Sequence, residues 1–543
     1  MTPEKAAAAA AVAGELREPP QRRLSWTRVG VAVLTVLLAA GAVTFVTLLG
    51  RDRAAAASAP PAEISPYVDV TNTPLYNFEE PVSNAAMTPT LGFVVAAEKN
   101  SCTPSWGGYY SLASAEESLN LDRRIARLRQ LGGDVSVSFG GAANTELAVG
   151  CTDPDALLAA YEMVVQRYQL TQIDLDIEGQ ASSEPGAVQR RATAIAALQR
   201  KQEAAGTSLS VWLTLPVTPA GLTKDGEQIL RTMLSAGVQV AGVNVMAMDF
   251  GTSKPEGMSQ SQAAIAAVTA TRQQVVAAQA ARGITLTDRQ SWQMLGVTPM
   301  IGQNDVAAER FTTADAAALA DFARDRGLGR IAFWSLNRDV ACGPNYAEVS
   351  AVSNSCSGVE QADGQFGKIF AAAGGPRVAS MDRPSQSATQ TPTPTEAGGD
   401  GRASADTLRD DPATSPYQIW KSAAAYVKGT KVVWHHNVYQ AKWWTQGDTP
   451  DAPVSSVTAT PWQLVGPVLP GDHPAATPTL PPGTYPAWDA TVAYQKGQRV
   501  LYGNVGYQAK WWTQGDLPGA DVVSPSDTPW QLITPAVPAT GSR

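Results

Sequence analysis

The side chains best suited to chemistry lie in one short segment, Ile173-Asp174-Leu175-Asp176-Ile177-Glu178-Gly179, in which acidic and aliphatic residues alternate. Because successive side chains of a strand point to opposite faces, this alternation predicts a strand with one acidic and one apolar face. Neighbouring carboxylates on the acidic face would lie about 6–7 Å apart at the backbone. Like charges at that spacing do not all ionise easily, so at least one carboxyl should hold a proton near neutral pH, as a general acid must.

Two other interpretations of this segment are a solvated acidic edge strand and a calcium site. The alternating aliphatic residues disfavour an exposed edge strand. A calcium site usually takes its ligands from a loop and not from one strand. We therefore expect a catalytic role for the three carboxylates.

Composition narrows the chemistry further. The chain has three histidines, all in its last quarter: His435, His436 and His473. Residues 60 to 375 thus contain no imidazole, which excludes Ser-His-Asp catalysis and most zinc sites there. A catalyst in this region is left with carboxylates, tyrosine, lysine or a cofactor, and we expect no cofactor and no metal. The net charge of −8, without a basic block beyond residue 53, also argues against a nucleic-acid partner.

The elements that must position these carboxylates alternate between short apolar runs and Ala-rich helical stretches. Eight strands are predicted, at Tyr67–Val70, Leu91–Ala96, Val135–Phe139, Gln172–Glu178, Leu209–Val217, Val243–Asp249, Leu295–Ile301 and Arg330–Leu336. The helical stretches include Asp122–Leu131, Asp155–Tyr168 and Thr313–Arg326. Strand–helix alternation over about 310 residues predicts an α/β fold, a (β/α)₈ TIM barrel, whose active sites lie at the carboxyl ends of the strands. An open doubly wound sheet is the alternative, but no Gly-rich phosphate loop follows Val70.

Four separated motifs in this region are the Asp174-x-Asp176-x-Glu178 run, Ser138-Phe139-Gly140-Gly141, Met246-Ala247-Met248-Asp249, and Trp334 in the eighth strand. Together they resemble the motifs of the family 18 glycoside hydrolases, the chitinase family. The resemblance implies substrate-binding roles for Ser138, Gly140, Gly141, Met246, Met248 and Trp334, the last as a floor under the sugar. Three positions depart from the family pattern: Thr171 and Gln172 replace its outermost Asp and the next Gly, and Met248 replaces a Tyr that binds the substrate's acetamido oxygen.

The resemblance also implies a mechanism, retention without an enzyme nucleophile. Glu178 would protonate the glycosidic oxygen and later deprotonate water. The acetamido carbonyl of the sugar would attack the anomeric carbon, while Asp176 orients that group. Asp174 and Asp249 would support Asp176.

The C-terminal region repeats itself at a spacing of 68 residues. The segment Tyr-Gln-Ala-Lys-Trp-Trp-Thr-Gln-Gly-Asp occurs identically at 439–448 and 507–516, and nine of the 14 tryptophans lie beyond residue 411. Two modules of about 50 residues are predicted, and they resemble the family 5/12 carbohydrate-binding modules, which bind chitin. The expected chitin-binding residues are Tyr439, Trp443, Trp444, Trp462, Tyr507, Trp511, Trp512 and Trp530. Strand alternation would turn one ring of each Trp-Trp pair inward and the other outward; a purely structural role for these tryptophans is the alternative.

The N-terminal residues predict that the chain is exported. Residues 29–50 form an uncharged apolar stretch of 22 residues, enough to cross a bilayer as a helix. Arginines are more numerous before it than after it, which places the N-terminus inside. Small residues at 54–59 permit cleavage, so the chain is either anchored at the cell membrane or secreted.

Four cysteines in an exported protein predict two disulfides. Cys342 and Cys356 are close in sequence after the last barrel strand, and Cys102 and Cys151 each follow a predicted strand at the same rim. We expect these two pairs, although four cysteines permit three connectivities.

These features divide the chain into a cytoplasmic segment 1–28, a transmembrane helix 29–50, a linker 51–62, a barrel 63–375, a disordered linker 376–415, a chitin-binding module 416–466, a linker 467–484 and a second module 485–535. A monomer that hydrolyses chitin is expected. The alternatives are an endo-β-N-acetylglucosaminidase acting on other glycans, which the chitin-type modules disfavour, and a non-catalytic lectin, which the presence of Glu178 disfavours.

Overall fold

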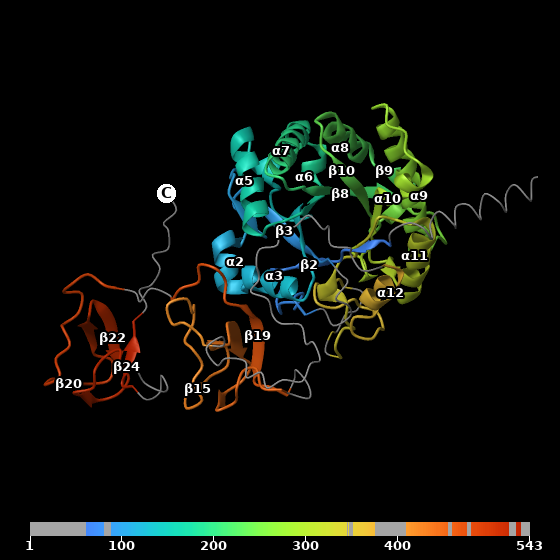
Figure 1. The fold of residues 1–543 in the computed structure, drawn as a ribbon. Coiled ribbons are helices and arrows are strands. Elements are labelled where there is room, and N and C mark those ends of the chain that lie inside the picture. The colour runs from blue at the N-terminus through green and yellow to red at the C-terminus, as the bar shows by residue number, and fades with distance from the viewer. Residues whose placement is uncertain are drawn as a thin grey trace, which may run out of the picture. The chain divides into compact units, whose positions relative to one another are not determined.

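Eight short apolar segments of the sequence form parallel strands around a common axis (Figure 1). The computed structural model describes residues 61–80, 88–344, 346, 351–374, 409–453, 459–474, 479–520 and 528–533. The barrel strands are β1 (Glu63–Ile64) with β2 (Tyr67–Asp69), β3 (Thr90–Ala96), β6 (Ser136–Gly140), β7 (Gln172–Asp176), β8 (Ser210–Thr218), β10 (Val240–Met246), β11 (Leu295–Thr298) and β14 (Arg330–Ile331).

The ring closes through the first segment. Strand order runs β14-β11-β10-β8-β7-β6-β3, with β1 beside β14 and β2 beside β3. Between β1 and β2, the N–H of Ser65 donates to the carbonyl of Ile331 at 2.9 Å, so the extended segment bridges both ends of the sheet. The expected (β/α)₈ barrel is therefore observed.

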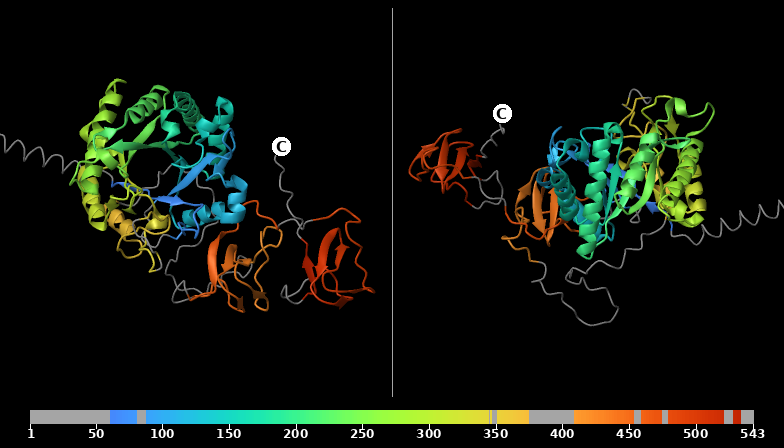
Figure 2. Two further views of the ribbon diagram at one scale, coloured as in Figure 1. Left: turned by 180° about the vertical axis from the view of Figure 1, so that it is seen from behind. Right: turned by 90° about the horizontal axis from the view of Figure 1, so that it is seen from above.

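Helices surround the strands, as two further views show (Figure 2). They are α2 (Leu112–Leu119), α3 (Leu121–Gln130), α4 (Leu147–Gly150), α5 (Pro154–Arg167), α6 (Gln180–Ser183), α7 (Pro185–Ala204), α8 (Lys224–Ser235), α9 (Gln260–Ala280), α10 (Asp288–Gln293), α11 (Thr313–Arg326), α12 (Gln365–Ala373), and the 3₁₀ turns η1 (Gly251–Ser253) and η2 (Leu336–Arg338). Local sequence explains their ends: α11 starts in a capping box of Thr312 and Asp315 and stops at Gly327 in the left-handed conformation. Short strands β4 (Pro104–Trp106), β5 (Tyr110–Ser111), β9 (Gly221–Leu222), β12 (Gly302–Gln303) and β13 (Arg310–Phe311) form antiparallel additions.

Several strands are shorter than the sequence predicts. The predicted strand 172–178 leaves the ladder after Asp176, and the predicted strand 330–336 leaves it after Ile331. Backbone hydrogen bonds continue beyond both ends. Ile177 N–H donates to the Thr214 carbonyl, and the N–H groups of Ala332 and Trp334 donate to the carbonyls of Val297 and Pro299. Tilted, staggered barrel strands end at different levels, which accounts for the early loss of pairing.

Both disulfides expected from the sequence are present. Cys102 is bonded to Cys151, and Cys342 to Cys356. The predicted transmembrane stretch lies outside the described residues. Within the part of the chain that the structure describes, no helix has the length and apolarity needed to cross a membrane.

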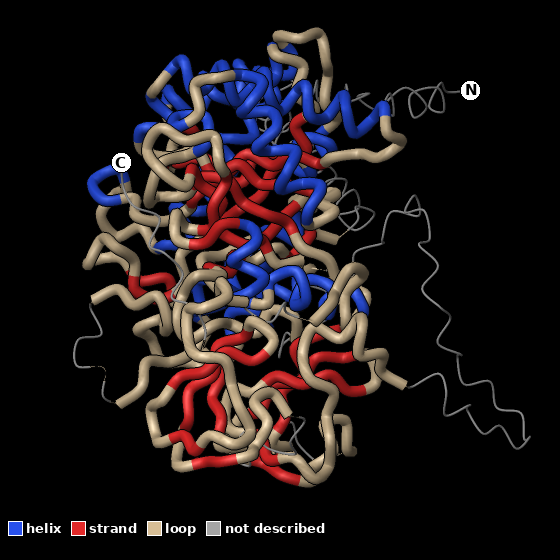
Figure 3. Tube along the Cα trace, turned by 90° about the vertical axis from the view of Figure 1, so that its left-hand side faces the viewer, coloured by secondary structure: helices blue, strands red, loops and turns tan. Residues whose placement is uncertain are grey.

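The repeated C-terminal region folds into strands and loops (Figure 3). The first repeat contains β15 (Ala425–Tyr426), β16 (Lys431–Trp434), β17 (Asn437–Ala441), β18 (Thr445–Gln446) and β19 (Trp462–Pro467); the second contains β20 (Ala493–Tyr494), β21 (Arg499–Tyr502), β22 (Val505–Ala509), β23 (Thr513–Gln514) and β24 (Trp530–Leu532). Each repeat pairs its five strands in the same order, as one two-stranded and one three-stranded sheet. Asp410, placed by the sequence in the preceding linker, accepts the backbone N–H groups of His435 and His436 and so packs with the first repeat.

Candidate active site

The acidic segment lines the interior of the barrel and runs toward the carboxyl ends of the strands. Asp174 and Asp176 lie in β7 and are buried, whereas Glu178, two residues beyond the end of β7, is partly exposed. The intervening Leu175 and Ile177 are buried in the apolar core. Strand alternation therefore places the three carboxyl groups in one column with Glu178 outermost.

Asp174 sits in a cluster of hydroxyl groups from neighbouring strands. Its Oδ2 accepts hydrogen bonds from Tyr67 Oη at 2.9 Å and Ser138 Oγ at 2.7 Å. Its Oδ1 accepts one from Thr214 Oγ1 at 2.7 Å. Burial raises the pKa of Asp174, while Arg330 and the three hydroxyl donors oppose that rise by favouring the ionised carboxylate.

Asp176 lies in a less favourable environment for a charge. Its Oδ1 is buried and, among the described residues, has no hydrogen-bond partner. Burial, followed by the charges of Glu178 and Asp174, raises the pKa of Asp176 well above its usual range. Hydroxyl donors and the cation of Arg330 thus favour the ionised form of Asp174, whereas its neighbours disfavour the ionised form of Asp176.

Glu178 has the titration behaviour of a general acid. Burial, followed by the charges of Asp249 and Asp305, raises the pKa of Glu178 to about 7. A carboxyl with that pKa carries a proton in a useful fraction of molecules at neutral pH and can give it up within one catalytic cycle.

A pocket of about 400 Å³ opens above the column. Its lining residues come from most of the strand ends: Tyr67, Phe93, Ala142, Asp176, Glu178, Thr214, Pro216, Val217, Met246, Met248, Asp249, Thr298, Met300, Asp305, Trp334 and Asn354. The ring of Trp334 stacks on that of Phe93 with centroids 5.5 Å apart and lies 6.1 Å from that of Tyr67. A flat aromatic wall beside carboxyl groups suits a sugar ring, whose C–H face packs on aromatic planes.

The carboxyl end of β10 contributes the next group of the pocket. Met246, Met248 and Asp249 all line it, so the thioether of Met248 occupies a place on the wall. Asp249 has a positive φ of 49°, and its Oδ1 accepts the N–H of Val306 at 2.8 Å. This bond fixes the loop that follows β12, which brings Asp305 to the pocket.

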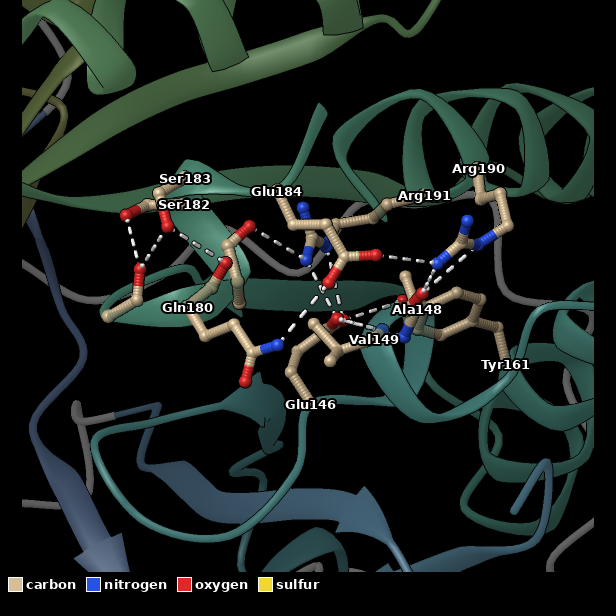
Figure 4. A network of polar contacts seen from close by, with 12 residues as sticks. Glu146, Ala148, Val149, Tyr161, Gln180, Ser182, Ser183, Glu184, Arg190 and Arg191 are labelled. Atoms are coloured by element: carbon tan, nitrogen blue, oxygen red, sulfur yellow. Dashed lines mark hydrogen bonds and ion pairs between the residues drawn. The ribbon is translucent and has the colours of Figure 1, made fainter. Parts of the chain in front are cut away.

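The turn after Glu178 is anchored by an ion pair between helices (Figure 4). Arg191 of α7 donates to both carboxylate oxygens of Glu146, at 3.1 and 2.7 Å, and Tyr161 donates to the same group at 3.0 Å. Arg191 also reaches the carbonyl of Ala181 in α6. The network holds α6, which begins directly after Glu178 and Gly179, against the helical layer.

Three expected substrate-binding residues lie elsewhere than the sequence implied. Ser138 is fully buried and bonds to Asp174, so it supports the column from below. Gly140 and Gly141 do not line the pocket. A Cβ at Gly140 would lie 2.0 Å from the Asp176 carbonyl oxygen, and one at Gly141 would lie 2.9 Å from the Phe93 ring, so both glycines permit close strand packing. Asp174 is likewise buried beneath the pocket and does not line it.

Sequence reasoning missed several pocket residues. Asp305 follows the seventh predicted strand, and a carboxylate at a barrel strand's carboxyl end is a recognisable signal. Tyr67 and Thr214 both donate hydrogen bonds to Asp174 through their hydroxyl groups. No local pattern indicates this contact, because the two residues are far from Asp174 in sequence. Asn354 reaches the pocket from the loop closed by the second disulfide.

The aromatic residues of the two repeats separate into core and surface. Trp462 is 2% and Trp530 4% exposed, and each donates its indole N–H to a backbone carbonyl, so the expectation that they contact chitin is wrong. Tyr439 is 7% exposed and belongs to the core of the first repeat. Tyr507 is partly buried and packs against the core of the second repeat.

Both rings of each Trp-Trp pair are exposed. The exposed fractions are 45% and 58% for Trp443 and Trp444, and 45% and 57% for Trp511 and Trp512. The expected alternation fails because each pair lies in a bend between two strands, where neighbouring side chains need not face opposite ways. Each repeat thus presents two adjacent indole rings to solvent.

Comparison with known proteins relates the barrel to chitinases. The chain is 34% identical over 290 residues to a probable bifunctional chitinase/lysozyme of Escherichia coli (strain K12), covering 52% of this chain and 31% of that protein. It is 33% identical over 285 residues to Endochitinase 11 of Metarhizium anisopliae, covering 51% and 52%. The chain thus spans about a third and about half the length of these relatives.

A solved structure and a family model extend the comparison. The catalytic domain of a hyperthermophilic chitinase from Pyrococcus furiosus matches with a TM-score of 0.50 and 28% identity, over 58% of this chain and 95% of that one. Residues 487–531 match the carbohydrate-binding module family 5/12. The barrel is therefore a chitinase-like glycoside hydrolase domain, and the chain ends in a carbohydrate-binding module.

Proposed function

We propose that this chain is a chitinase that hydrolyses β-1,4-linked N-acetylglucosamine polymers by substrate-assisted catalysis. The observation that carries the proposal is the column of three carboxyl groups, with Glu178 at the rim of a pocket beside the aromatic face of Trp334. The similarity of the barrel to chitinases supports the same conclusion.

The geometry suggests a role for each group. Glu178, partly protonated at neutral pH, donates its proton to the glycosidic oxygen. The acetamido carbonyl of the substrate attacks the anomeric carbon and forms an oxazolinium ion. Asp176 orients the acetamido group, and the negative charge of Asp174 below it stabilises the cation. Water then opens the oxazolinium, giving its proton to Glu178.

Incubation with colloidal chitin, followed by analysis of the products, tests the proposal. Chito-oligosaccharides are expected. Release of intact glycans from a glycoprotein, without products from chitin, would favour an endo-β-N-acetylglucosaminidase. Binding of chitin without any product would favour a lectin.

The rate should fall as pH rises through about 7. Glu178 must be protonated to act as an acid, and burial with the charges of Asp249 and Asp305 sets its pKa at about 7. Above that pH the carboxyl is ionised and kcat/KM should drop about tenfold per pH unit. Initial rates on a soluble chito-oligosaccharide between pH 4 and pH 10 check this, and a constant rate up to pH 9 would contradict it.

We further propose that both repeats bind chitin through their exposed Trp pairs. The family match covers only the second repeat, but the first has the same strand pairing, and the neighbouring lysine lies over the first Trp ring in both, Lys442 at 4.8 Å and Lys510 at 4.6 Å. Two adjacent exposed indoles offer aromatic surface to the C–H faces of a polysaccharide.

Replacing Trp443 and Trp444 with Ala should weaken adhesion to insoluble chitin, and replacing all four tryptophans should weaken it much more. Two linked modules can raise avidity by about 10²- to 10⁴-fold. A single remaining functional module cannot supply this gain. Sedimentation with chitin measures binding, and Val427→Ala, at another exposed apolar residue of the first repeat, is the matched control. Undiminished binding by the fourfold variant would exclude these rings.

A chitinase with such modules has its substrate outside the cell. We propose that residues 29–50 direct export and either anchor the chain at the membrane or are removed by cleavage. Both disulfides are compatible with an oxidising compartment.

A further inference from the structure

The barrel interior holds a buried cation, Arg330, beneath the carboxylate column. Its side chain is fully buried, with Nη1 3.6 Å from Oδ1 of Asp174, which is fully buried as well. Its Nη2 lies 3.3 Å from Oε2 of Glu63, at the amino end of the barrel. Among the described residues, Nε and Nη1 of Arg330 have no hydrogen-bond partner. The guanidinium is thus placed for its charge more than for its hydrogen bonds.

The surrounding strands make room for this guanidinium. Strand pairing sets Arg330 of β14 beside Gly296 of β11 and Glu63 of β1. The guanidinium carbon lies 4.2 Å from the centroid of the Trp212 ring. A Cβ at Gly242 would lie 2.3 Å from that ring, and one at Gly296 would lie 3.1 Å from Cβ of Arg330. Two glycines on adjacent strands therefore create the space in which Trp212 and Arg330 stack.

Stability alone gives no reason for a cation in this place. Removing a guanidinium from water is costly, and a buried ion pair is often no more stable than apolar residues of similar size. Buried charges that act on other titratable groups are characteristic of functional sites. The group nearest to Arg330 on the pocket side is Asp174.

We propose that Arg330 is a positioning residue for the reaction: it keeps Asp174 ionised at working pH, so that the Asp174–Asp176 pair carries one negative charge and one proton. The inference rests on the proposed function. With Asp174 ionised, a negative charge lies beneath the oxazolinium ion even while Asp176 holds a proton. Without Arg330 the pair would become neutral at a higher pH and would lose that stabilisation.

The other charged groups around the column leave this role to Arg330. Asp174 faces Asp176 and Tyr67. Burial, followed by the charges of Asp174 and Asp176, raises the pKa of Tyr67 well above its usual range, so the phenol stays neutral. Arg338 is also buried, but the carboxylates whose charges act on it are Asp305 and Asp249 at the rim. Among the residues that the structure describes, Glu63 at the amino end and Glu178 at the rim are the further charged groups next to the column.

The test is the pH dependence of kcat/KM for the full chain on a soluble chito-oligosaccharide. Arg330→Met should move the acid limb to higher pH by about 1–3 units, the effect expected for loss of an opposite charge near a carboxylate. The alkaline limb, set by Glu178, should stay in place. Arg330→Lys keeps the charge and should leave the acid limb nearer to that of the wild type. Circular dichroism at each pH separates the limb from acid unfolding.

Arg124→Met is the matched control. Arg124 is also buried and pairs with Glu79 at 2.9 Å, away from the pocket. Its loss should lower stability and leave both limbs unchanged. An acid limb that stays in place in folded, active Arg330→Met would overturn the inference while the proposed function stands. No hydrolysis by the wild type would instead refute the proposed function.

Glu63→Gln decides the matter if Arg330→Met does not fold. Removing the anion that competes for Arg330 strengthens the effect of the guanidinium on Asp174, so the acid limb should move to lower pH. An acid limb that is unchanged or shifts upward in this variant would contradict the proposed role.

Discussion

Glu178→Gln should lower kcat/KM on chito-oligosaccharides by about 10²- to 10⁴-fold and leave their affinity nearly unchanged. The substitution removes the proton donor but keeps the size and the hydrogen-bonding oxygen of the side chain. The rest of the pocket, including Trp334 and Asp176, still binds the sugar. Stopped assays on a soluble oligomer give the rate, and calorimetric titration gives the affinity.

Glu184→Gln is the matched control for this change. Glu184 lies six residues further along the chain, at the start of α7, and its carboxylate is directed to Arg190 at 3.3 Å and not into the pocket (Figure 4). Activity should therefore persist in Glu184→Gln. If Glu178→Gln kept more than a few per cent of the wild-type rate, another group would have to be the acid.

Fully deacetylated chitosan should not be hydrolysed at a detectable rate. The proposed mechanism has no enzyme nucleophile, and an amino group without its acetyl carbonyl cannot attack the anomeric carbon. Loss of an intramolecular nucleophile removes a well-oriented reactant whose effective molarity can reach about 10⁵–10⁸ M. Reducing-end assays on matched oligomers, acetylated and deacetylated, measure the difference.

Binding must be checked in the same experiment, because a deacetylated oligomer could fail simply by not entering the pocket. Its ability to compete with an acetylated substrate shows occupancy. Hydrolysis of the deacetylated oligomer at a rate near that of the acetylated one would mean that water attacks directly, with Asp176 or Asp249 as the base.

The local pattern of the sequence is sufficient to predict the barrel and the carboxylate column of the site. Alternation in 172–178 places Asp174, Asp176 and Glu178 on one face because side-chain direction in a strand depends only on position. Thr313–Arg326 is found as a helix with the predicted bounds, since its caps are local signals. Contacts between strands that are distant in sequence lie outside these local rules.

The residues that surround the column depend on strand register. Tyr67, Thr214 and Arg330 meet Asp174 from three strands distant in sequence, and no local spacing encodes such a meeting. The same reason explains the errors. The motif of Ser138 predicts contact with the substrate, but its level in the barrel puts it beneath Asp176. Composition suggested that some tryptophans of the repeats are exposed, but only the bends between strands determine which ones.

Met248 makes the mechanism worth testing directly. Its thioether lines the pocket where the family pattern implies a phenol for the acetamido oxygen, so this chain would have to stabilise the attacking group with one hydrogen bond fewer, worth roughly 0.5–1.5 kcal/mol. Proton NMR during the first minutes of hydrolysis of a chito-oligosaccharide reports the anomer released. Substrate assistance proceeds through two inversions and predicts the β-anomer, whereas initial release of the α-anomer would contradict the account.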